Sequence, residues 1–146
     1  MQKIDILFKE PTIPTISSLL TEQSPKTSKG VKYGYLTGIQ YLSPSDVSGM
    51  VNLCSYASEG CRIACLNTAG RASFDAAIPH ARLNRTIWYV KFKAEYWTRL
   101  IKEIRALERK AQRLGLILCL RLNGTSDQPW ERIRIKGTDT ALDGLT

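Results

Sequence analysis

Residues 97–127, WTRLIKEIRALERKAQRLGLILCLRLNGTSD, contain the pattern that decides the fold. From Trp97 to Leu114, apolar residues recur at helical spacing, and lysine and arginine fill the complementary surface. Gly115 ends this pattern, and the following run LILCLRL is typical of a buried strand in a parallel sheet. The polar turn NGTSD comes next. The stretch therefore predicts a long, amphipathic, basic helix that leads into a strand.

A second strand is predicted upstream, at residues 33–42 (YGYLTGIQYL). This segment is rich in aromatic and β-branched residues and runs into SPSDVSG, a cluster of turn-forming residues. Strand, long helical segment and strand follow one another in the βαβ order. We therefore expect an α/β fold that contains a partial parallel sheet or a fragment of a barrel-like fold.

Polar segments follow both predicted strands. Ligands of parallel α/β proteins gather at the carboxyl ends of strands, so these segments are expected at one edge of the sheet. In the second segment, Asp127 could act as a base, metal ligand or nucleophile, and Asn123, Thr125 and Ser126 could bind a polar substrate. Alternatively, NGTSDQPW is only the turn that enters a helix, with Asp127 or Ser126 as its cap.

Three of the four cysteines lie close together after the first strand. Cys54, Cys61 and Cys65 have the spacing Cys-x6-Cys-x3-Cys on a polar loop, which predicts a metal or cluster site, with redox pairing as the alternative. Three thiolates suit an iron-sulfur cluster with one open iron, whereas a structural zinc site needs a fourth ligand, from His80 or Cys119. The sequence does not choose between a zinc ion and an iron-sulfur cluster at this site. Cys119 itself lies in an apolar run and is expected to be a core residue.

The formal charge is +8, and its excess falls in one segment. Residues 62–113 contain twelve lysines and arginines against four acidic residues, and the rest of the chain is balanced. Arg82 and Arg85 lie three apart on a predicted helix, and Arg71 follows the cysteine loop, so the three could hold a phosphate or carboxylate. Solvated surface is the favoured interpretation for the basic residues at 102–113. The net charge suits a nucleic-acid or nucleotide partner.

The chain divides into three parts by composition. Residues 1–30 contain prolines and few periodic apolar positions and predict an N-terminal arm, residues 31–133 form the α/β domain with the cysteine loop, and residues 134–146 form a tail. No apolar stretch is long enough for a membrane span, so no membrane partner is expected. The first residues lack the apolar core of a secretory signal, which predicts a reducing, cytoplasmic environment.

Three segments carry a resemblance to a known family: GYLTGIQYLSPSDVSGMVNLCSYASEGCRIACLNTAGR (34–71), ARLNRT (81–86) and LRLNGTSDQPWE (120–131). They resemble the gene product 88 family of bacteriophages and mobile elements. That family joins the same cysteine loop to an arginine-containing helix and then to a strand ending in Arg-Leu-Asn-Gly-Thr-Ser-Asp. The resemblance covers about residues 24–133 and favours a site at the polar turn. It implies the cytoplasm of an infected or carrier bacterium. Because family members continue further, it also implies a short or truncated member.

Two classes of function follow from these patterns. The first is a zinc- or cluster-dependent phage enzyme acting on a nucleotide or nucleic acid, with the three cysteines holding the metal and Asp127 and the arginines lining the pocket. The second is a small, basic protein without catalytic activity, whose cysteine loop is folded by a structural metal and which binds nucleic acid or a host protein. A sheet with few strands is also expected to expose a strand edge and an apolar helix face, which favours self-association.

Overall fold

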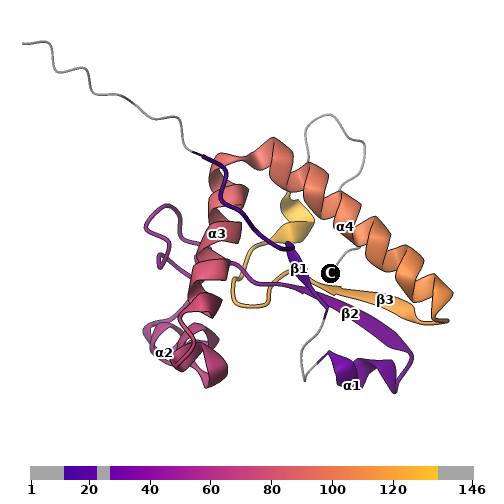
Figure 1. The fold of residues 1–146 in the computed structure, drawn as a ribbon. Helices are drawn as coiled ribbons and strands as arrows, with labels where there is room; N and C mark the ends of the chain where they lie inside the picture. Colours follow the sequence, from indigo (N-terminus) through magenta and orange to yellow (C-terminus); the bar gives the residue numbers. More distant parts are fainter. Residues whose placement is uncertain (1–11, 23–26, 135–146) are drawn as a thin grey trace, which may run out of the picture.

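The computed structural model describes residues 12–22 and 27–134. Its elements, in chain order, are β1 (Leu20–Thr21), α1 (Ser28–Val31), β2 (Tyr35–Gln40), α2 (Glu59–Ile63), the single-turn helices η1 (Leu66–Thr68) and η2 (Gly70–Ser73), α3 (Ala77–Lys91), α4 (Lys93–Arg113), β3 (Ile117–Arg121) and the single-turn helix η3 (Trp130–Arg132). Helices and strands alternate around one sheet (Figure 1). The α/β class predicted from the sequence is confirmed.

The sheet has the strand order β1-β2-β3. Strands β2 and β3 are parallel, with Tyr35 opposite Ile117 and Ile39 opposite Arg121, and helices α3 and α4 connect them. This is the predicted βαβ unit. Strand β1 adds an antiparallel pair, with Leu20 opposite Gln40, so the sheet is mixed and not wholly parallel. The difference arises because β1 comes from a segment in which the sequence predicted no strand.

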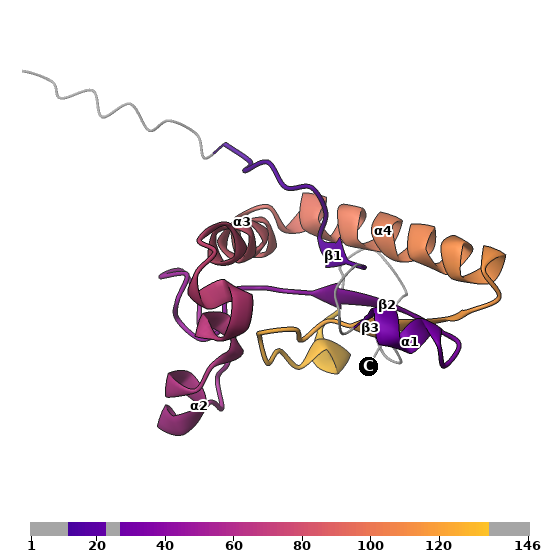
Figure 2. The ribbon, with the colours of Figure 1, turned by 60° about the horizontal axis from the view of Figure 1, so that its bottom comes forward.

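Helix α4 covers one face of the sheet through its apolar side. Leu100 and Leu107 are buried there, and a Cβ atom on Gly38 of β2 would come within 2.8 Å of Leu107 Cδ1, so the helix packs very close to the strand. Gly115 has φ +67°, and the Leu116 N–H donates to the Ala111 carbonyl at 2.9 Å, which ends the helix where the sequence predicted. Figure 2 shows α3 and α4 on one side of the sheet and α1 and η3 on the other.

Strand β3 is covered on one face only. This corrects the expectation that Cys119 lies in the core, and the packing of α4 on that face corrects the expectation of an uncovered apolar helix face. Ile117 is 64% exposed and Cys119 is exposed, whereas Leu118 and Leu120 are half-buried. Successive residues of a strand point to opposite faces, and only one face of β3 packs against α4. The prediction that Cys119 is a core residue is therefore wrong. Within the described residues no strand pairs with the outer edge of β3, as expected, but the apolar side of α4 is covered by the sheet.

The described part of the segment expected as an arm is packed into the core. Leu19 and Leu20 are 0% and 4% exposed, and both backbone N–H groups donate to the carboxylate of Glu103, at 2.9 to 3.0 Å. The Trp88 indole donates to the Pro14 carbonyl at 2.7 Å. Residues 1–11 of the expected arm and residues 135–146 of the expected tail lie outside the described residues. None of the described helices is both long enough and apolar enough to cross a bilayer.

Candidate functional site

The segments that follow β2 and β3 lie against each other at the carboxyl edge of the parallel pair. The Asp127 N–H donates to the Leu53 carbonyl at 2.9 Å, and the Gly124 N–H donates to the Gln40 carbonyl at 2.9 Å. A Cβ atom on Gly124 would come within 2.4 Å of the Gln40 carbonyl oxygen, so only glycine permits this approach. The structure thus brings together the two polar segments that the sequence placed at one edge.

Most side chains of the NGTSD turn bond within the turn or to its neighbours. The Asn123 Oδ1 accepts hydrogen bonds from Trp130 Nε1 at 2.7 Å, from the Gln128 N–H at 3.0 Å and from Ser126 Oγ at 3.3 Å. The Thr125 hydroxyl donates to the Leu42 carbonyl. Asp127 is exposed, and η3 has no side-chain cap. Asn123, Thr125 and Ser126 therefore build this edge of the molecule, whereas Asp127 projects from it.

The three clustered cysteines differ in burial and in the groups that they contact. The Cys54 side chain is buried with its Sγ 3.9 Å from the Thr125 carbonyl, and the half-buried Cys65 Sγ accepts a hydrogen bond from the Asn67 N–H at 3.4 Å. Cys61 lies exposed on α2, whose first turn is capped by the Ser58 hydroxyl. Among the described residues no group of three or more histidine, cysteine or acidic side chains could hold a metal ion. In this conformation the cysteines do not fit a zinc ion or an iron-sulfur cluster.

Arg82 of α3 is a buried cation at the same edge. It is 8% exposed, and its Nη1 donates to the Asn67 backbone and side-chain carbonyls at 3.2 and 2.6 Å. Its guanidinium lies over the Tyr41 ring, 5.5 Å from the ring centre. Burial lowers the pKa of Arg82, while the nearby Tyr41 and Cys65 raise it. We call Tyr41, Cys65, Asn67 and Arg82 the Arg82 cluster.

The Arg82 cluster contains no carboxylate. None of the ion pairs between described residues includes Arg82, so its charge is held by amide and carbonyl oxygens and by an aromatic ring. A buried charge normally has a partner of opposite sign, because desolvation without one is costly. The neighbouring Leu66 and Thr68 are exposed, so the cluster lies close under the surface.

Buried polar atoms without a partner concentrate around the end of β2. Among the described residues, the three such side-chain atoms are Arg82 Nε, Ser45 Oγ and Gln40 Oε1. Whichever way the Gln40 amide is oriented, one of its polar atoms pairs with the Tyr96 hydroxyl and the other is left over. Ser45 also has φ +48°, a conformation rare for a residue other than glycine. Unpaired groups and backbone strain at one place are typical of a ligand site.

The other two arginines expected in the site lie elsewhere. The Arg85 Nε donates to the Ser18 carbonyl at 2.8 Å, so this side chain fastens the N-terminal segment. Burial lowers the pKa of Arg85, and Glu103 raises it. Arg71 is exposed on η2. Of the three arginines, Arg82 is the one in the cluster.

Sequence reasoning missed Tyr41, Ser45 and Asn67 as members of this edge. Tyr41 reads as the end of a strand and Ser45 as part of a turn, and Asn67 lies in the family-like segment 34–71, where the sequence assigns it no role. Tyr41 and Asn67 contact Arg82 because α3 packs against the loops after β2. A single sequence contains no signal for it.

A comparison with known families agrees with the motifs at this edge. A family model described as gene product 88 matches residues 17–140. The chain belongs to the gene product 88 family. This family is phage-type, and the match includes the cysteine loop, α3 and the turn after β3. No curated protein and no solved structure gives a significant match to the chain.

Proposed function

We propose that this gene product 88 protein binds a phosphate-bearing ligand, a nucleotide or the end of a nucleic-acid strand, at the Arg82 cluster. The observation that carries the proposal is a guanidinium that is 8% exposed, has no carboxylate partner among the described residues and retains an Nε–H without an acceptor. We place this binding in the cytoplasm of a bacterium that carries a phage or mobile element.

The physical argument rests on what an anion would add to the cluster. Burial lowers the pKa of Arg82 because the charged guanidinium loses water and gains no counter-ion. An oxyanion that reached the Nε–H, which is buried in this conformation, would supply both the missing charge and an acceptor. Charge-assisted hydrogen bonds between arginine and phosphate are roughly twice as strong as neutral ones. The ligand would then stabilise the folded protein through this contact.

A phosphate fits the neighbours of Arg82 better than a cation or an apolar group would. The Asn67 carbonyl oxygens hold Nη1 in place and leave Nε free, so the guanidinium is pre-oriented. The Tyr41 ring packs on the guanidinium and leaves Nε without an acceptor. Neither group provides the extra negative charge that a metal cation would need.

Binding of inorganic phosphate, a nucleoside monophosphate and acetate, measured by calorimetry, tests the proposal. We expect both phosphate compounds to bind, and Arg82→Gln to weaken that binding by about ten- to a hundredfold, the value of a charged hydrogen bond. Arg82→Lys keeps the charge without the planar fork and should fall between the two. Arg71→Gln removes an exposed arginine from the same basic segment, residues 62–113. It is the control and should bind like the wild type.

Circular dichroism of each variant separates a lost site from a lost fold. If folded Arg82→Gln binds phosphate as tightly as the wild type, the proposal is wrong. If acetate binds as tightly as phosphate, the site is a carboxylate site and the nucleotide assignment is wrong.

A further inference from the structure

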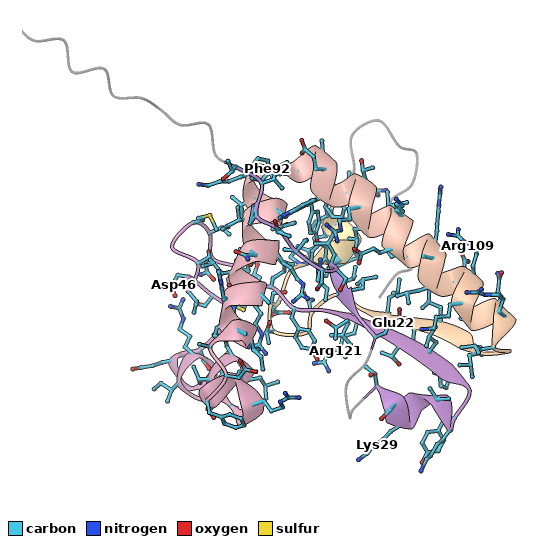
Figure 3. All side chains as sticks on the ribbon, in the orientation of Figure 1. Glu22, Lys29, Asp46, Phe92, Arg109 and Arg121 are labelled. Carbon is cyan, nitrogen blue, oxygen red and sulfur yellow. The ribbon has the colours of Figure 1, made fainter. Side chains whose placement is uncertain are left out.

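Helix α4 has an exposed basic surface that the Arg82 cluster does not use. Lys102, Arg105 and Arg109 are exposed and follow one another at intervals of three and four residues, so they share one side of the helix. The buried Leu100 and Leu107 occupy the opposite side, against the sheet. Figure 3 shows Arg109 on the outer side of α4. We call Lys102, Arg105 and Arg109 the α4 stripe.

Neighbouring acidic side chains do not neutralise the α4 stripe. Glu103 binds Arg99 at 2.9 Å and Glu22 binds Lys110, and the exposed Glu108, one turn from Arg105 on α4, forms no ion pair with the stripe among the described residues. No ion pair between described residues includes a stripe residue. The three charges therefore face solvent and are available to an anionic partner.

Thr98 and Ile101 lie beside the α4 stripe on the same helix, and Thr98 is exposed. Successive stripe residues rise along the helix by roughly 4.5 and 6 Å, at 1.5 Å per residue. This separation is similar to that between neighbouring phosphates of a nucleic-acid strand, so the charges can each meet one phosphate.

The composition of the stripe distinguishes between anionic partners. Membrane-surface helices place exposed large apolar residues beside their basic face, whereas the one large apolar residue here, Ile101, is half-buried. Single-stranded nucleic acids are usually held by exposed aromatic side chains that stack on bases, and the stripe has none. Two of its three cations are arginines, which suit phosphate oxygens. These features favour contact with a phosphodiester backbone alone.

We propose that the α4 stripe binds the sugar-phosphate backbone of a double-stranded nucleic acid without reading its sequence. This inference is independent of phosphate binding at the Arg82 cluster. It differs from the expectation drawn from the sequence, in which Arg71, Arg82 and Arg85 would carry the contact. Arg82 and Arg85 are engaged inside the protein and Arg71 stands alone on η2, whereas the three exposed charges of the stripe lie together on α4.

The salt dependence of binding to DNA and RNA duplexes of unrelated sequence tests this surface. Three neutralised phosphates predict a slope of roughly −3 when the logarithm of the binding constant is plotted against the logarithm of the salt concentration. The variant Arg105→Gln/Arg109→Gln should weaken binding at low salt and reduce the slope by about two. The variant Lys29→Gln/Lys32→Gln removes the same charge from exposed residues of α1 and its end, and should change the slope little.

Three further results would overturn the proposal. Equal effects of the two double variants would mean that net charge, and not the α4 stripe, controls binding. Loss of duplex binding in Arg82→Gln, with binding retained in the stripe variant, would place the contact at the Arg82 cluster. Equally tight binding of a polyglutamate peptide of matched charge would identify an acidic protein as the partner. Inorganic phosphate binding in the stripe variant should stay at the wild-type value, which keeps this test separate from that of the Arg82 cluster.

Discussion

At the scale of single residues, the Asn123 side chain holds the turn after β3 together by hydrogen bonds. It accepts three hydrogen bonds and donates one more, to the Gln128 carbonyl at 3.0 Å. One of its donors is the indole of Trp130, which is 2% exposed and packs in the core. The residue therefore joins the turn after β3 to the interior, and the sequence expectation of a direct ligand contact at Asn123 stays a prediction.

Replacement of Asn123 by alanine tests this structural role. Asn123→Ala leaves the buried Trp130 N–H without an acceptor, so we expect the free energy of unfolding to fall by about 2 to 3 kcal/mol. Denaturant unfolding measures the change. Asp127→Asn, four residues away and exposed, is the control and should differ from the wild type by less than about 0.5 kcal/mol. A loss of stability in the Asp127 variant that equals the loss in Asn123→Ala would contradict this account.

At the scale of elements, the cysteine loop connects β2 to α3 and spans three short helices. Its first cysteine is anchored against the turn after β3, its last lies beside Arg82, and α2 holds Cys61 at the surface, extended away from the sheet (Figure 2). Metal binding by the trio stays a prediction from their spacing. The structure adds a condition, because the loop must rearrange around α2 before three thiolates can meet one ion.

Metal analysis of freshly purified, anaerobically handled protein tests this prediction. If the trio binds metal, the wild type should contain zinc or iron that the variant Cys54→Ser/Cys61→Ser/Cys65→Ser lacks, and an iron-sulfur cluster would also absorb visible light near 400 nm, which zinc does not. Cys119→Ala removes an exposed cysteine outside the loop and tests separately whether Cys119 supplies the fourth ligand. Equal metal content in the triple variant and the wild type would rule out the trio as a metal site.

At the scale of the whole molecule, the sequence predicted the βαβ unit because its signals are local. Apolar spacing marks α4, Gly115 marks its end, and the flanking apolar runs become β2 and β3. Strand β1 could not be predicted in this way. The backbone N–H groups of Leu20, its first residue, and of Leu19, just before it, donate to Glu103, more than eighty positions away in the chain, so no window of sequence contains both partners.

In the candidate site, too, the sequence predicts local features but not the contacts between residues that are distant in the chain. The sequence predicted Arg82 as an anion ligand from its charge and its helix, which stays a prediction, and it placed the polar segments at one edge of the sheet. It could not show that Arg82 contacts Asn67, fifteen positions earlier, or that Arg85 turns toward Ser18. It also could not show that only one face of β3 is covered. Self-association through the outer edge of β3 stays a prediction.

The central claim is that Arg82 is a buried cation prepared for an anionic ligand. The most direct measurement is the nitrogen-15 NMR signal of the Arg82 Nε–H, assigned by its loss in Arg82→Lys and followed during titration with inorganic phosphate. We predict that this signal shifts with a saturating curve, because phosphate provides the acceptor that Nε lacks among the described residues, while the signal of the exposed Arg71 shows no comparable saturating shift. An Arg82 signal that does not move, or that moves no more than those of the exposed arginines, would contradict the account.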